Sequence, residues 1–138
     1  IYQPGEIKVA AYKNDTKIGE KSIVTTGEPV SLKLTPDRKT INADGKDLSY
    51  VLVEAIDENG HICPLADNLL KIKIDGPGRI AGVGNGNPQS INRFQSDSLY
   101  LFYGKAMIIV ASDLEKGEVQ LQVTSEGLKK AKTIIKTN

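Results

Sequence analysis

Residues 48–60 decide the fold, and they read LSYVLVEAIDENG. Apolar side chains occupy both alternating faces of 48–56, with Val51, Val53 and Ala55 on one face and Tyr50, Leu52 and Ile56 on the other. A strand of this kind is usually central in its sheet and covered on both sides. The turn formers of 57–60 then end it. We therefore expect a central β-strand at 48–56, followed by a reverse turn.

Apolar and polar residues continue to alternate with a period of two on both sides of this strand. This alternation predicts further strands at 6–12, 17–25, 30–34, 70–74, 79–83, 99–103, 106–111, 119–123 and 130–136. A helix at 125–132 competes, because Leu128 and Ala131 are spaced i and i+3, but Gly127 and the β-branched stretch 133–135 disfavour it. The predicted fold class is all-β: an immunoglobulin-like antiparallel β-sandwich with an additional N-terminal β-hairpin.

The sequence GEP at 27–29 is the natural place to divide the chain. The strands are more numerous than the ~7 of an immunoglobulin-like domain. We therefore expect residues 1–26 to be the terminal hairpin of a preceding immunoglobulin-like domain, and 28–138 to be a bacterial immunoglobulin-like β-sandwich module. An isolated two-stranded hairpin is marginally stable. It should pack on the larger module, pair with another copy, or belong to a neighbour.

The overall composition excludes several classes of partner. The chain has 138 residues and begins at Ile1, so we expect a processed chain or an excised piece. Its net charge of +1 gives no reason to propose nucleic acid as a partner. No apolar run approaches the ~18 residues that span a bilayer, so no membrane partner is expected. The start also lacks the pattern of a signal peptide.

The candidates for a metal site are weak. Cys63 is the sole cysteine and His61 the sole histidine, so they supply at most two of the three or four ligands of a zinc site. The turn at 57–60 fails the calcium-loop pattern, whose sixth and twelfth positions here are Ile62 and Asn68. We expect no metal and no cofactor, with His61 in a loop and Cys63 as a buried structural thiol.

A glycine-rich segment, GVGNG at 82–86, superficially resembles a phosphate-binding loop. The dinucleotide fingerprint requires a helix after the glycines, whereas Asn87 and Pro88 follow here. We therefore expect a shaped loop in which glycine permits positive φ. Because loops often carry function, the candidate contact loop is Asn85, Gly86, Asn87 and Pro88.

No pattern of catalytic residues stands out, and we predict none. A glycosidase needs two carboxyl groups ~5–10 Å apart, but most carboxylates here fall in turns or on polar strand faces. Glu54 lies in the most apolar strand, where a salt-bridged or strand-edge position is expected. A serine triad would have to use His61, and no G-x-S-x-G motif occurs. The aromatic residues Tyr50, Phe94, Tyr100, Phe102 and Tyr103 could form a sugar-stacking platform, but at strand spacing we expect them in the core.

An ordered series of motifs runs along nearly the whole chain. The first, YQPGEIKV at 2–9 with AYK at 11–13, resembles the last strands of the immunoglobulin-like domain that follows the catalytic barrel in family 2 glycoside hydrolases. The rest resemble the next module of bacterial β-galactosidases in that family: GEP at 27–29, LKLTPDR at 32–38, ADGKDL at 43–48, DENG at 57–60, CP at 63–64, ADN at 66–68, GPG at 76–78, IAGVGNGNP at 80–88 and TSEGL at 124–128. ADGKD and DENG are also similar to invasin-type bacterial immunoglobulin-like repeats.

The resemblance implies a non-catalytic C-terminal accessory domain of a β-galactosidase whose catalytic glutamates lie in an absent barrel. Its expected roles are stability, domain packing or the rim of the substrate cleft. The expected partners are the barrel and neighbouring immunoglobulin-like domains, with a homodimer through hairpin 1–26 as a further possibility. The implied location is periplasmic or secreted, in a bacterium. The alternative is a carbohydrate-binding or invasin-like adhesive module.

Overall fold

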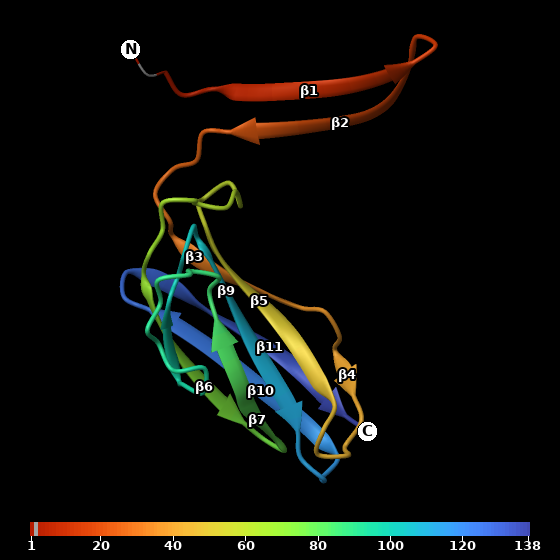
Figure 1. The fold of residues 1–138 in the computed structure, drawn as a ribbon, viewed down its shortest axis with the longest axis vertical. Coiled ribbons are helices and arrows are strands. Elements are labelled where there is room, and N and C mark those ends of the chain that lie inside the picture. The colour runs from red at the N-terminus through yellow and green to blue at the C-terminus, as the bar shows by residue number, and fades with distance from the viewer. Residues whose placement is uncertain (2) are drawn as a thin grey trace.

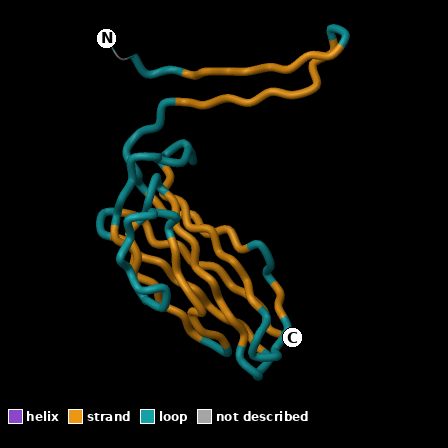
Figure 2. Tube along the Cα trace, in the orientation of Figure 1, coloured by secondary structure: helices purple, strands orange, loops and turns teal. Residues whose placement is uncertain are grey.

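The computed structural model describes residues 1 and 3–138, and every regular element in that part of the chain is a strand (Figures 1 and 2). Tyr2, in the first motif above, lies outside the described residues. The strands are β1 (Glu6–Lys13), β2 (Thr16–Val24), β3 (Ser31–Pro36), β4 (Thr40–Ile41), β5 (Leu48–Ile56), β6 (Leu69–Asp75), β7 (Gly78–Gly84), β8 (Ser98–Tyr100), β9 (Lys105–Ser112), β10 (Gly117–Ser125) and β11 (Leu128–Thr137). The all-β prediction is confirmed, and the described residues contain no helix that could span a membrane.

The strands from β3 onward form a two-layered sandwich. One layer has the order β7-β9-β5-β3 and the other β11-β10-β6-β8, and neighbours within each layer run antiparallel. β3 and β4 differ, because both pair with β11 in parallel. The chain from β3 to β4 therefore passes from one layer to the other and joins them along this side. β4 was not predicted, because two residues are too few to show an alternation.

β5 lies between β3 and β9, the central position predicted for it. Val51, Val53 and Ala55 face the other layer and are fully buried. The opposite face is not covered: Tyr50 is 41% exposed, and Leu52 is half-buried. The prediction of cover on both sides is therefore wrong, because a two-layered sandwich covers only one face of each sheet.

Aliphatic side chains fill the core between the layers. Those that are almost completely inaccessible include Leu70, Leu99, Ile108, Val110, Val119, Leu121, Val123 and Ile135. Full burial of one such side chain stabilises the fold by about 1.5–3 kcal/mol. The predicted helix competitor at 125–132 is not formed, since β10 and β11 meet there in a turn at Glu126-Gly127 with Gly127 at φ 75°.

β1 and β2 form a separate two-stranded sheet that extends beyond one end of the sandwich (Figure 1). Their turn places Asn14 and Asp15 at φ 48° and 61°, and positive φ at both central residues suits the twist of a tight hairpin. Ile7 lies directly opposite Ile23, and their side chains are 72% and 71% exposed. The hairpin therefore does not fold its apolar residues back onto module 28–138.

Candidate functional site

The predicted contact loop, Asn85 to Pro88, follows β7 and is held against β8. The Asn85 side-chain amide donates to the Tyr100 carbonyl at 2.9 Å, and its Oδ1 accepts from the Asn87 backbone N–H at 3.0 Å. Gly86 between them has φ 74°, in the left-handed region that glycine adopts at little cost. The loop thus has a definite shape, as its glycines predicted, while a contact role for it stays a prediction.

The segment after this loop packs back on β7. The Asn87 side chain accepts from the Gln89 backbone N–H at 2.9 Å, which turns the chain again. Further along, the Phe94 carbonyl accepts from Val83 N–H at 2.7 Å. The Phe94 ring lies directly over Gly82, where an added Cβ would come within 2.2 Å of the ring. Gly82 is therefore required for close packing of this segment on the strand.

A shallow cavity of about 350 Å³ lies between this loop and β8. Its lining includes the amide side chains of Asn85, Asn87, Gln89 and Asn92 and the aromatic residues Tyr100 and Phe102. The sequence analysis named two of these asparagines. It missed Gln89 and Asn92, because no local pattern shows that β8 lies beside the loop.

The aromatic residues lie at the surface and not in the core, so that prediction is wrong. Phe94, Tyr100 and Tyr103 are 61%, 53% and 67% exposed, and Phe102 is half-buried. Phe102 and Tyr103 form an edge-to-face pair, with their ring centroids 4.5 Å apart. The cause is that aliphatic residues fill the inward positions of the strands, which leaves the rings on loops and outward positions.

Asp57 organises the turn that contains His61, and it does so as a hydrogen-bond acceptor. Its carboxylate accepts from the backbone N–H groups of Gly27 at 3.0 Å, Asn59 at 3.0 Å and His61 at 2.9 Å. The Gly27 N–H is the main cause that lowers the pKa of Asp57 below its ordinary value of 3.8, although partial burial opposes it. The reverse turn predicted at 57–60 is confirmed.

The neighbouring thiol is structural. Cys63 is buried, and burial raises the pKa of its thiol. Its Sγ contacts the Gly27 carbonyl oxygen at 3.4 Å. The His61 side chain approaches Asp57 through Nδ1, which lies 3.7 Å from Asp57 Oδ2. Within residues 1 and 3–138 no three His, Cys, Asp or Glu side chains gather to hold a metal ion.

Glu54 is salt-bridged, as predicted for a carboxylate in an apolar strand. It is 7% exposed and lies between the ammonium groups of Lys33 at 3.9 Å and Lys105 at 3.6 Å, which come from the two strands beside β5. This arrangement accounts for Glu54 as part of the fold.

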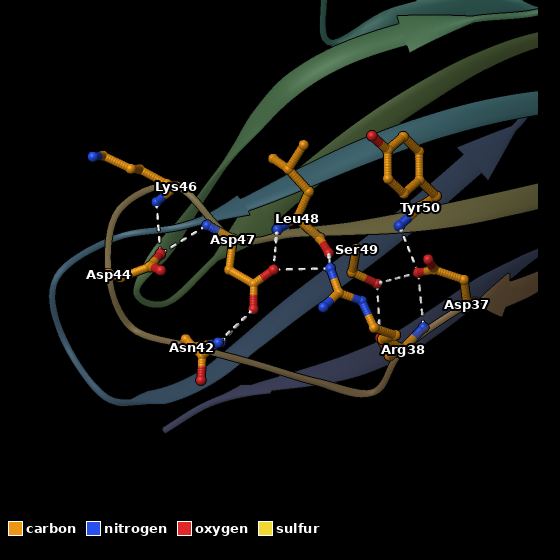
Figure 3. A network of polar contacts seen from close by, with 9 residues as sticks. All are labelled: Asp37, Arg38, Asn42, Asp44, Lys46, Asp47, Leu48, Ser49 and Tyr50. Atoms are coloured by element: carbon orange, nitrogen blue, oxygen red, sulfur yellow. Dashed lines mark hydrogen bonds and ion pairs between the residues drawn. The ribbon is translucent and has the colours of Figure 1, made fainter.

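A polar network occupies the opposite end of the sandwich, near the C-terminus (Figures 1 and 3). Asp47 accepts from the Asn42 backbone N–H and the Arg38 guanidinium, both at 2.8 Å. Asp37 accepts from Tyr50 N–H at 2.7 Å, and Asp44 accepts from Asp47 N–H at 2.8 Å. These bonds hold the chain between β3 and β5, so the motifs LKLTPDR and ADGKDL serve to shape this connection.

A hollow of about 710 Å³ lies over the outer face of β10 and β11. Most residues in its lining are polar, and one charged pair crosses strands there, with Lys136 Nζ 3.9 Å from Glu118 Oε1. Ile134 is the exposed apolar residue on its floor. The hollow is therefore a twisted, solvent-facing sheet surface with ordinary cross-strand pairs.

Known proteins resemble this chain over almost its full length. β-Galactosidase BoGH2A of Bacteroides ovatus is 46% identical over 130 residues, which are 94% of this chain and 15% of that enzyme. A β-glucuronidase of Formosa agariphila is 32% identical over 139 residues, 99% of this chain and 14% of that enzyme. The crystal structure of a glycosyl hydrolase family 2 member from Bacteroides cellulosilyticus matches with a TM-score of 0.94 and 31% identity, over 99% of this chain and 18% of that one.

The chain thus spans about 15% of the length of these two curated relatives. The family described as glycoside hydrolase family 2 C-terminal domain 5 matches residues 32–134, which cover the strands of the sandwich except the first residue of β3 and the last three of β11. This chain is therefore a C-terminal domain of the family 2 glycoside hydrolases, as its motifs predicted.

Proposed function

We propose that this chain is a non-catalytic accessory domain of a β-galactosidase, in which it stabilises the enzyme by packing against the catalytic barrel at the rim of the substrate cleft. The observation that carries the proposal is the 46% identity to a β-galactosidase over 94% of this chain but only 15% of that enzyme. This chain corresponds to a short C-terminal domain, so the catalytic chemistry would come from the rest of the parent enzyme.

The carboxylates support a non-catalytic role. Asp44, Asp47 and Asp57 accept backbone N–H groups that shape turns, and Glu54 is held by two lysines. Groups committed in this way have pKa values kept low or charges already paired, whereas a general acid needs a raised pKa. None of these four carboxyl groups is therefore arranged as a glycosidase acid.

The hairpin of residues 1–26 is proposed to complete the preceding immunoglobulin-like domain of the parent. Ile7 and Ile23 form a cross-strand pair on one face, with Val9 two residues from Ile7, and all three side chains are exposed in this chain. Burial of such a pair against another sheet is strongly favourable. The neighbouring domain is its proposed partner in the whole enzyme, and a second copy is its partner when this chain is isolated.

The parent is proposed to be a periplasmic or secreted bacterial enzyme, on the strength of the resemblance alone. Cell fractionation with detection of the full-length protein tests this location. Detection only in the cytoplasmic fraction would contradict it.

Activity measurements test the accessory role. The purified chain should not hydrolyse a chromogenic β-galactoside, and the parent enzyme should do so. Removal of residues 28–138 from the parent should lower its thermal stability together with its activity. If the purified chain hydrolyses the substrate, the Glu54→Gln variant serves as a contamination control, and activity that persists at constant specific rate through repeated purification would overturn the proposal.

A further inference from the structure

The cavity between the contact loop and β8 presents hydrogen-bonding groups that the fold itself does not use. The side-chain amides of Gln89 and Asn92, the Asn87 amide nitrogen and the Tyr100 hydroxyl make no hydrogen bond among the described residues, and all four residues line the cavity. Amides and a phenol offer both donors and acceptors. This mixture suits a ligand that carries several hydroxyl groups.

The backbone that carries these groups is already fixed before any ligand binds. Asn85 ties the loop to the Tyr100 carbonyl at 2.9 Å, and Asn87 turns it through the Gln89 N–H at 2.9 Å. Phe94 then anchors the following segment on Gly82 of β7. A site with a pre-set backbone loses less conformational freedom on binding. The atoms that shape the loop are thus distinct from the side-chain atoms that remain free to contact a ligand.

The cavity also has an apolar side and a suitable size. Tyr100 and Phe102 line it, and the Tyr100 side chain is 53% exposed, so an aromatic surface is available beside the amides. Its volume of about 350 Å³ is at the small end of ligand sites, which run from about 300 to 1,000 Å³. Such a space fits a small polar ring better than a long chain.

The charged groups in the lining indicate which class of ligand the cavity would bind. Asp67 is the one ionisable acid in the lining, and the lining holds no lysine or arginine. A carboxylate without a neighbouring cation disfavours an anionic ligand such as a phosphate or a uronic acid. A neutral polyol meets no such penalty, and a carboxylate oxygen is a good acceptor for its hydroxyl groups.

We propose that this cavity binds a neutral hexose residue of an oligosaccharide, with Gln89, Asn92, Asp67 and Tyr100 as the contacting side chains. The choice of a galactose-containing probe rests on the proposed function, whereas the site itself rests on the cavity. In the parent enzyme, this site would hold a part of the substrate remote from the bond that is cleaved. Because its lining is acidic, it would favour neutral sugars over glucuronic acid.

A titration of the ¹⁵N-labelled chain with galactobiose, followed by NMR, tests the proposal. We expect saturable shift changes confined to residues 67, 85–92 and 100–102, with a dissociation constant in the millimolar range and much weaker binding of glucuronic acid. Gln89→Ala and Tyr100→Ala should each weaken binding roughly tenfold. Tyr50→Ala, which removes a similarly exposed ring from β5, is the matched control and should leave binding unchanged.

Two outcomes would overturn the proposal. The first is the absence of saturable shifts with galactobiose at high millimolar concentration while the spectrum shows a folded chain. The second is an equal loss of binding in Tyr50→Ala, which would indicate non-specific stacking. If Tyr100→Ala fails to fold, Gln89→Ala still tests the proposal, because the Gln89 side chain makes no hydrogen bond among the described residues. The accessory role is measured separately by activity of the parent, so either proposal can fail without the other.

Discussion

The Asp57 carboxylate accepts a hydrogen bond at 3.0 Å from the backbone N–H of Gly27, thirty positions earlier in the chain. Gly27 stands in the connection between the hairpin and the sandwich, and its carbonyl also contacts the buried Cys63 thiol. One turn of the sandwich thus fixes the point at which the chain passes from the hairpin into the sandwich. The direction of the hairpin depends on these contacts.

Replacement of Asp57 by Ala should loosen the connection between β2 and β3. The N–H groups of Gly27, Asn59 and His61 would lose their acceptor together. Hydrogen exchange followed by mass spectrometry should show faster exchange at 25–30 and 57–63, with little change in β10 and β11. The control is Glu58→Ala at the neighbouring exposed position. Unchanged exchange at 25–30 in Asp57→Ala would contradict the role of this hydrogen bond.

Acid should destabilise the chain through Asp44, Asp47 and Asp57. Backbone N–H donors are the main causes that lower the pKa of each carboxyl below 3.8, so at acid pH the unfolded chain binds more protons than the folded one. Their stabilisation is complete above about pH 5 and is lost as the pH falls through the lowered folded pKa values.

Urea unfolding at several pH values measures this effect. The midpoint should fall between about pH 5 and pH 3 in the natural chain, and it should fall less steeply in Asp47→Asn. That variant should also be less stable at neutral pH, because a neutral amide is a weaker acceptor for the Arg38 guanidinium. A midpoint independent of pH down to about pH 3 would contradict the assignment.

Gly76→Ala should be far more harmful than Gly127→Ala, although both glycines have positive φ. The φ values are 101° and 75°, but an added Cβ at Gly76 would lie 2.2 Å from the Glu118 carbonyl oxygen, whereas the Cβ at Gly127 would meet open space. We expect a loss of about 3 kcal/mol for Gly76→Ala, against about 1 kcal/mol for Gly127→Ala. Chemical denaturation measures both, and equal losses would show that close approach to β10 is unimportant.

The isolated chain should self-associate through its hairpin. Ile7 and Ile23 are a largely exposed cross-strand pair, and an exposed two-stranded sheet favours pairing with another copy. Light scattering should detect a dimer, and the double change of Ile7 and Ile23 to Glu should make it monomeric. Leu114→Glu, at an exposed leucine elsewhere, should not change the mass. A natural chain that is strictly monomeric, with rapid exchange throughout 7–24, would contradict this pairing.

The sequence predicted most of the fold, because the signals for strands and tight turns are local. Apolar residues on both faces of 48–56 placed β5 and its central position, and Gly127 correctly marked the turn before β11. Short or unusual elements carry no such signal. The two residues of β4 are held by the neighbouring β11, and nothing in their own types indicates a strand.

The site was less predictable, because its parts meet only in the folded chain. The motif GNGNP gave the position of the loop, but its contact with Tyr100 joins residues from different strands. The aromatic residues show a related difficulty. A strand pattern gives two alternating faces, and only the packing of the layers decides which face holds Tyr100 and which holds Leu99.

The parallel pairing of β11 with β3 and β4 has a mechanical consequence. The sandwich begins with β3 at the hairpin end and finishes with β11, whose last residues lie at the far end (Figure 1). A force that pulls the two ends apart would slide these strands along each other, and their hydrogen bonds would be loaded together and not opened one by one. The parallel pairing should therefore make the sandwich resistant to tension applied between Ser31 and Thr137.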